Sequence, residues 1–201
     1  MNLGDPAQGP QLSWDFCEAL NFAAQMHLRQ FRKGNPIPFV SHLLAVASLV
    51  LEYGGNEDEA IAALLHDAVE DQGGRPVLDR IRRRFGETVA EIVEGCTDSY
   101  TIPKPPWRER KESYICHLAN ASPSVLLVCT ADKVHNARSL VRDYRELGNS
   151  LWSTFKGGRE GTLWNYRALL EALRARSKSS LVDELEREVG KLENLVKAQS
   201  C

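Results

Sequence analysis

The sequence lacks long apolar runs, a cysteine framework and a strong excess of charge of either sign. No apolar run approaches the roughly 18–20 residues that would span a bilayer. The opening stretch MNLGDPAQGPQLSW has neither the basic nor the apolar region of a signal peptide. We therefore expect a cytoplasmic protein that does not interact with membranes.

Charge is nearly balanced, with 25 Lys and Arg against 27 Asp and Glu and a formal net charge of −2. Proteins that bind nucleic acid through its phosphates normally carry a clear positive excess. The balance argues against a general electrostatic attraction to nucleic acid or to an anionic membrane.

The cysteine count also excludes two kinds of scaffold. The five cysteines are an odd number, and no CxxC motif occurs among them. A disulfide framework or a thiolate zinc site is therefore disfavoured. We expect buried free thiols at Cys17, Cys96, Cys116, Cys129 and Cys201.

The chain of 201 residues, 43% of them apolar, is long enough for one compact domain with a sizeable core. Apolar residues recur mainly at helical spacing, and no internal repeat is visible. We expect an all-α, bundle-like domain over residues 13–176, preceded by a flexible segment 1–12 and followed by a C-terminal helix within 177–201. The expected helices cover 13–31, 41–53, 57–70, 77–84, 87–96, a segment from near 107, 160–176 and the C-terminal segment.

Two segments leave alternatives open. The run VLLVCTA (125–131) is rich enough in β-branched residues to favour a strand, although periodicity does not decide so short a run. The C-terminal helix has one apolar stripe and is otherwise charged. This helix either docks on the body of the domain or pairs with a partner subunit, which leaves a homodimer open.

The stretch LLHDAVED (64–71) gathers one imidazole and three carboxylates after an apolar run. If residues 57–71 form one helix, His66 and Glu70 share a stripe, and Asp67 and Asp71 share the neighbouring one. Carboxylates near a helix C-terminus oppose the helix dipole. A bound cation would relieve this repulsion, so the pattern predicts a metal site.

One helix does not complete such a site. His42 lies in a separate apolar helix, and Asp132 follows the apolar run 125–131. Taken alone, each has an ordinary interpretation, as a helix histidine and a helix cap. Together with His66 and Asp67 they form a mixed imidazole and carboxylate set that suits Mn²⁺, Fe²⁺ or Zn²⁺. Glu70 and Asp71 would then lie beside the metal, where a general base is needed.

Four blocks now carry a family resemblance. The order H…HDxxED…D resembles the HD-domain superfamily of metal-dependent phosphohydrolases, and more narrowly the hydrolase domain of RelA/SpoT alarmone enzymes and the small alarmone hydrolases. The blocks are RKGNPIPFVSHLLAVA (32–47), AALLHDAVED (62–71), FGETVAEIVEGCTD (85–98) and TADKVHNARSL (130–140).

The resemblance implies an all-helical fold and a reaction. Members hold one Mn²⁺, which would be ligated here by His42, His66, Asp67 and Asp132, with Fe²⁺ or Zn²⁺ less favoured. Glu70 and Asp71 match the pair that activates water. The family removes the 3′-pyrophosphate of (p)ppGpp, which gives GDP or GTP and pyrophosphate. No synthetase activity is expected.

The resemblance also implies substrate contacts. Arg32 and Lys33 match a basic pair that contacts the nucleotide, and Asn136 matches an asparagine near the ribose and base. Arg110 and Lys111 lie where relatives carry another basic pair. These two either reach a distal phosphate or belong to a solvated helix face.

Two distinctive segments, TIPKPPWRER (101–110) and STFKGGREGTLWNYR (153–167), are expected to border the pocket and to affect the choice of nucleotide. Three alternatives to (p)ppGpp hydrolysis remain open. The protein could hydrolyse another nucleotide, such as an adenine alarmone, the 2′-phosphate of NADPH or a deoxynucleoside monophosphate. It could also be a catalytically silent nucleotide-binding module, or a scaffold stabilised by a metal.

Overall fold

A computed structural model describes residues 10–100 and 103–199, and its regular elements within these ranges are all helices. An isolated bridge between Phe31 and Pro38 is the one β-type pairing there. None of these helices is long and apolar enough to cross a membrane. The all-α prediction is confirmed. The helices are α1 (Trp14–Met26), α2 (Val40–Glu52), α3 (Glu57–Leu65), α4 (Ala68–Gln72), α5 (Arg75–Phe85), α6 (Glu87–Cys96), α7 (Trp107–Leu118), α8 (Pro123–Leu147), the 3-10 helix η1 (Gly148–Thr154), α9 (Gly158–Arg176) and α10 (Ser180–Ala198).

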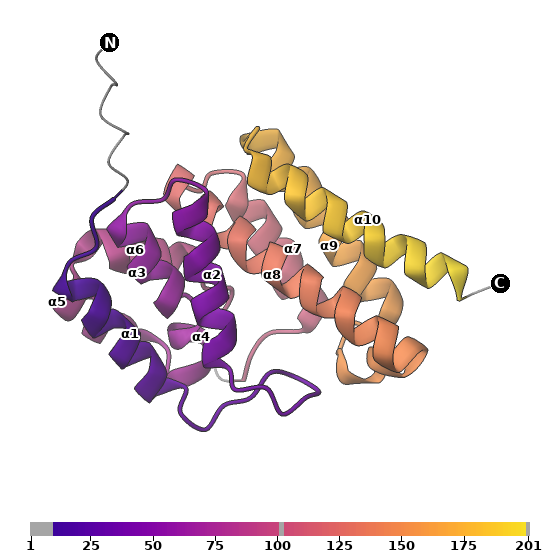
Figure 1. The fold of residues 1–201 in the computed structure, drawn as a ribbon, viewed down its shortest axis with the longest axis horizontal. Helices are drawn as coiled ribbons and strands as arrows, with labels where there is room; N and C mark the ends of the chain where they lie inside the picture. The colour runs from indigo at the N-terminus through magenta and orange to yellow at the C-terminus, as the bar shows by residue number, and fades with distance from the viewer. Residues whose placement is uncertain (1–9, 101–102, 200–201) are drawn as a thin grey trace, which may run out of the picture.

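The longest helix, α8, runs between the N-terminal helices and α9 and α10 (Figure 1). It contains residues 125–131, so the predicted strand is wrong. The start signal precedes the apolar run: the Ser122 hydroxyl accepts from the Val125 amide, and Pro123 occupies the first turn. The run is apolar because it is buried among α2, α3, α6 and α10 rather than because it is extended.

Several helix boundaries agree with local signals in the sequence. Ser13 caps α1 by accepting from the Asp15 amide, and Gly86, with a φ of 90°, separates α5 from α6. The predicted helix 13–31 is too long, because α1 ends at Met26 and a loop leads from there to α2.

The expected single helix over residues 57–71 is interrupted. α3 ends at Leu65 and α4 begins at Ala68, so His66 and Asp67 lie in the turn between them. The His66 ring donates through Nδ1 to the Ala63 carbonyl oxygen at 2.7 Å, and so takes an acceptor that the helix backbone would otherwise use. Glu70 and Asp71 therefore lie in a short separate helix, α4, and not at the end of one helix over residues 57–71, as the prediction required.

The C-terminal helix α10 packs along α8 and α9 (Figure 1). Its apolar stripe is buried against them, which confirms docking on the body. Ser179 is its N-cap. The homodimer, the division at residue 176 and the cytoplasmic location stay predictions. The stripe comprises Leu181, Leu185, Val189, Leu192 and Val196.

The cysteines in the described ranges are free, but only some are buried. Cys129 is buried and Cys96 is partly buried, whereas Cys17 and Cys116 are exposed. The prediction of buried thiols is therefore wrong for Cys17 and Cys116, which lie on the solvent faces of their helices. Cys201 and residues 1–9 of the predicted flexible N-terminus lie outside the described residues.

Replacing Leu185 with Ala should lower the free energy of unfolding by about 2–5 kcal/mol, because this fully buried side chain would leave a cavity under α10. Chemical denaturation measures the change. The exposed Asn194 of the same helix, changed to Ala, provides the control and should shift stability by less than about 0.5 kcal/mol. Equal effects of the two changes would contradict the docking of α10.

Candidate metal centre and adjoining cavity

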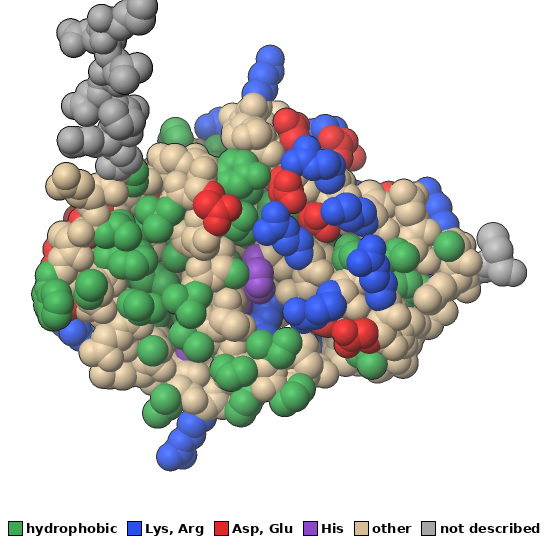
Figure 2. All heavy atoms as spheres, viewed as in Figure 1, with side chains coloured by type: hydrophobic (Ala, Val, Ile, Leu, Met, Phe, Trp, Pro, Cys, Tyr) green, Lys and Arg blue, Asp and Glu red, His purple; other side chains and the backbone are tan. Residues whose placement is uncertain are grey.

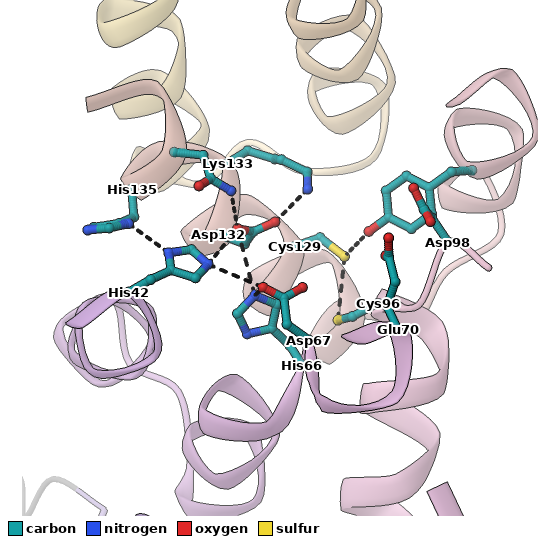
Figure 3. A network of polar contacts seen from close by, with 12 residues as sticks. His42, His66, Asp67, Glu70, Cys96, Asp98, Cys129, Asp132, Lys133 and His135 are labelled. Carbon is teal, nitrogen blue, oxygen red and sulfur yellow. Dashed lines mark hydrogen bonds and ion pairs between the residues drawn. The ribbon is translucent and has the colours of Figure 1, made fainter. Parts of the chain in front are cut away.

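Two imidazoles and two carboxylates from three parts of the chain point toward one another (Figure 3). His42 comes from α2, His66 and Asp67 from the turn after α3, and Asp132 from α8. The His42 Nε2 atom lies 3.5 Å from Asp67 Oδ2 and 3.2 Å from Asp132 Oδ1. The His66 Nε2 atom lies 3.1 Å and 3.7 Å from the same two oxygens. We call these four residues the His/Asp cluster.

The donor set fits a cation. Because the Ala63 carbonyl can only accept, His66 Nδ1 must carry a hydrogen, and in the neutral ring its Nε2 atom then presents a lone pair to Asp67. The buried Nε2 atoms of both His42 and His66 have no hydrogen-bond partner. One ligand atom each of His42, His66 and Asp67 lies within 4.8 Å of the others. Converging lone pairs of nitrogen and oxygen are what a divalent cation needs.

A third histidine orients His42. The two Nδ1 atoms of His42 and His135 are 2.7 Å apart, so one donates and the other accepts. Burial and the neighbouring His42 lower the pKa of His135 to about 3, which keeps its ring neutral. If His135 accepts, His42 donates through Nδ1 and offers its Nε2 lone pair to the cluster. The sequence analysis missed His135, although its position one turn after Asp132 is a usable signal.

The charges within the cluster are strongly coupled. Burial alone would raise the pKa of Asp67, but His66 and His42 hold it well below its usual range. Burial alone would likewise lower the pKa of His66, but Asp67 and Asp132 raise it well above its usual range. Without a metal ion, a proton on His66 offsets the carboxylate charge. A bound cation would serve the same purpose.

Asp132 connects the cluster to an adjoining cavity. Lys133 Nζ lies 2.5 Å from Asp132 Oδ2, and the Asn136 side-chain amide donates to Asp132 Oδ1. Arg32 Nη2 in turn donates to Asn136 Oδ1 at 2.6 Å. Since Arg32, Lys133 and Asn136 all line the cavity, its inner wall is tied directly to the cluster.

The cavity has a volume of about 510 Å³ and brings together all five residues predicted to contact substrate. Its described lining is strongly basic, with seven Lys and Arg side chains against two carboxylates. Such a wall suits a polyanionic ligand. The basic residues are Arg32, Lys33, Lys104, Arg110, Lys111, Lys133 and Lys156; the carboxylates are Glu70 and Asp143; and Asn136 completes the predicted set.

The structure separates Glu70 from Asp71. Glu70 lines the cavity, with its Oε1 atom 2.7 Å from Lys104 Nζ and 3.5 Å from Arg110 Nη1. Asp71 lies outside the cavity lining and accepts a hydrogen bond of 2.7 Å from Gln30. Burial and the nearby Asp98 raise the pKa of Glu70, which makes its carboxylate a stronger base. Burial and Asp67 likewise raise the pKa of Asp71.

Arg110 and Lys111 face the cavity rather than forming a solvated helix face. Arg110 forms an ion pair with Asp98, and Lys111 Nζ lies 2.6 Å from Asp98 Oδ2. Although burial alone would raise the pKa of Asp98, Lys111 and Arg110 lower it to about 2. Asp98 thus fixes both cations beside Glu70.

The two distinctive segments both border the cavity, as predicted. Residues 101–110 contribute Lys104, Trp107 and Arg110, and residues 153–167 contribute Phe155 and Lys156 among others. The sequence analysis had not singled out Lys104, Lys133 or Lys156 as individual residues.

Comparisons with known proteins identify the family of this chain. The family model of the HD domain matches residues 19–163. The chain belongs to the HD-domain family. This HD-domain protein is 42% identical over 128 residues to guanosine-3′,5′-bis(diphosphate) 3′-pyrophosphohydrolase MESH1 of Xenopus tropicalis, covering 62% of this chain and 69% of the relative. The human MESH1 is 39% identical over 128 residues, with the same coverage of both chains.

Solved structures agree with the family assignment. One, described as a metazoan ortholog of SpoT that hydrolyzes ppGpp, superposes with a TM-score of 0.72 and 25% identity over 95% of this chain and 98% of that chain. A protein of Listeria monocytogenes superposes with a TM-score of 0.65 and 30% identity over 74% of this chain and 96% of that chain. The fold of the SpoT ortholog is thus shared along nearly the whole chain.

Changing His135 to Phe should weaken the binding of Mn²⁺, used here as a probe ion, by about 10- to 100-fold. The variant keeps a ring at this position but removes the hydrogen bond that orients His42. Isothermal titration calorimetry gives the affinity. The exposed His117, changed to Phe, serves as the control. Unaltered affinity in His135→Phe would exclude the orienting role.

Proposed function

We propose that this HD-domain protein hydrolyses the 3′-diphosphate of guanosine tetra- and pentaphosphate, producing GDP or GTP and pyrophosphate, with Mn²⁺ as its metal ion. The observation that carries the proposal is the buried His/Asp cluster joined, through Asp132, to a cavity lined by seven basic side chains. The family membership and the named activity of the MESH1 relatives support the same substrate.

The metal ion would be held by His42, His66, Asp67 and Asp132. A mixed nitrogen and oxygen set suits Mn²⁺, with Fe²⁺ and Zn²⁺ as less favoured alternatives. When bound, the ion would polarise a phosphoryl oxygen and lower the pKa of a water molecule. When bound, the ion would interact with the histidine lone pairs and with the two carboxylates. These interactions would offset the free-energy cost of burying the ligand atoms.

Glu70 is the proposed general base. It lies on the cavity wall, and its raised pKa makes its carboxylate a better acceptor for the proton of the attacking water. Lys104 and Arg110 hold one of its oxygens. Asp71 is the second proposed member of the water-activating pair; its carboxylate lies outside the cavity lining and accepts a hydrogen bond from Gln30.

The basic wall neutralises the substrate. Arg110 and Lys111 are fixed by Asp98 beside Glu70, and Lys133 lies against Asp132. These three cations are therefore held close to the proposed reaction centre, where they would balance charge on the departing pyrophosphate. Asn136, held between Asp132 and Arg32, would contact the ribose or base.

The proposal predicts Mn²⁺-dependent release of pyrophosphate from ppGpp. Asp67→Ala should abolish both Mn²⁺ binding and release, because it removes a carboxylate that faces both histidines. Pyrophosphate is assayed with and without chelator, and Mn²⁺ binding is measured by calorimetry. Retained Mn²⁺ affinity in this variant would refute the ligand assignment. A wild-type protein that binds Mn²⁺ but leaves ppGpp intact would exclude this substrate, and NADPH, adenine alarmones and deoxynucleoside monophosphates would be assayed next.

Glu70→Gln should retain Mn²⁺ binding and lower kcat by about 10²- to 10⁴-fold, because the amide no longer accepts the proton. Steady-state kinetics and calorimetry on the same preparation separate the two effects. Glu91→Gln, at an exposed position outside the basic cavity, is the matched control. Near wild-type turnover in Glu70→Gln would remove Glu70 from the mechanism.

A further inference from the structure

The basic residues of the cavity divide into two groups by their partners. Four of them are paired with carboxylates of the protein: Lys104 with Glu70, Arg110 and Lys111 with Asp98, and Lys133 with Asp132. Among the described residues, the other three have no carboxylate within ion-pairing distance. These are Arg32, Lys33 and Lys156.

Of these three, Arg32 is tied to the inner end of the cavity. Its Nη2 atom donates to Asn136, which in turn holds Asp132 of the His/Asp cluster. Lys33 and Lys156 have no such connection in the described structure and are both exposed, so they lie at the outer end. Lys33 Nζ lies 4.9 Å from the centre of the Phe155 ring, and Phe155 directly precedes Lys156 in the chain. Partial burial, and then the proximity of Lys156, lower the pKa of Lys33.

An aromatic and glycine contact fixes the segment that carries Lys156. A Cβ atom on Gly157 would lie 2.7 Å from the Trp107 ring, and one on Gly161 would lie 3.1 Å from it. Trp107 also packs edge-on against Trp164, at 6.2 Å between ring centroids, and the Arg108 guanidinium stacks 3.3 Å from the Trp164 ring centre. This contact, which joins the start of α7 to the start of α9, holds the two distinctive segments together.

We infer that Lys33 and Lys156 form a second phosphate subsite, which takes the 5′-diphosphate of the nucleotide, and that the contact of Trp107 with Gly157 and Gly161 positions Lys156 for this role. The inference rests on the proposed function. That function puts the 3′-diphosphate at the His/Asp cluster, so the second diphosphate of the same molecule needs cations elsewhere in the cavity.

The ion pairs within the cavity indicate which cations are available to the second diphosphate. Two lysines held near each other without a counter-ion repel, and a diphosphate between them would remove the repulsion. The four paired cations are already partly neutralised by Glu70, Asp98 and Asp132. Lys33 and Lys156 are the cavity lysines at the outer end whose charge is not balanced by a carboxylate of the described residues.

Binding experiments on the Mn²⁺-loaded protein test the subsite without requiring turnover. The two probes are GDP, which carries a 5′-diphosphate, and guanosine 3′-monophosphate, which has no 5′-phosphate. Lys156→Gln should weaken GDP binding about fivefold, the size expected for one exposed charge contact, and leave the 3′-monophosphate within twofold. Lys156→Glu should weaken GDP binding further, because it adds a repulsive charge. Lys178→Gln, an exposed lysine outside the cavity, is the control and should change neither affinity.

A second variant separates positioning from simple loss of charge. Gly157→Ala keeps Lys156 but places a methyl group against the Trp107 ring, so it should also weaken GDP binding selectively. Gly190→Ala is its control, since a Cβ atom there meets nothing within 4 Å. A shift of GDP affinity in Gly157→Ala that is matched by the 3′-monophosphate would indicate a general disturbance and overturn the positioning role.

The outcomes distinguish this inference from the proposed function. Wild-type protein that does not bind GDP, or Lys156 variants that affect both probes equally or neither, would overturn the subsite whether or not ppGpp is hydrolysed. Absence of pyrophosphate release from ppGpp, with GDP binding that still depends on Lys156, would overturn the proposed reaction and keep the subsite.

Discussion

The structure depends on the cost of bringing two carboxylates and two imidazole lone pairs together in a buried position. His42 is fully buried, and His66 and Asp132 are nearly so. Such a group of acceptors is destabilising unless a positive charge lies among them. The helices α2, α3 and α8 nevertheless pack against one another beside it. Lys133 and Asn136 offset the Asp132 carboxylate, and the remaining negative charge is offset by a proton on His66, whose pKa is raised, or would be offset by a bound cation.

The arrangement of charged side chains around this cluster is not visible in the amino-acid composition. A net charge of −2 indicates no preference for an anionic or a cationic ligand. Nevertheless, seven basic side chains among the described residues line one cavity. Asp98, Glu70 and Asp132 pair with Arg110, Lys104 and Lys133, respectively. Each cation is held in place by a carboxylate that is itself fixed, so the wall is positive on balance but preorganised. Preorganised charge stabilises a polyanion without the cost of reorienting side chains.

Much of the fold could be predicted from the sequence because the signals for its helix boundaries are local. Ser13 and Gly86 mark helix boundaries through contacts with their immediate neighbours, and the structure has the same boundaries. The errors arose where composition and periodicity alone were followed. The run 125–131 has the composition of a buried strand, but the cap at Ser122 and its burial among four other helices go with a helix. The interruption at His66 coincides with a side chain that bonds to the backbone three residues earlier. The candidate ligands were reached by motif, whereas His135 and Lys156 acquire their candidate roles from contacts with residues far away in the chain.

One turn of α8 explains why the cluster and the cavity form a single unit. Asp132 faces the histidines, Lys133 and Asn136 hold its two oxygens, and His135 orients His42. These positions are fixed relative to one another by helical geometry alone. Any tilt or shift of α8 would therefore move the cluster carboxylate, its counter-ion and the cavity wall together. Most side chains of α8 between residues 125 and 134 are buried. This burial, the property that made the sequence look like a strand, is what keeps that turn in place.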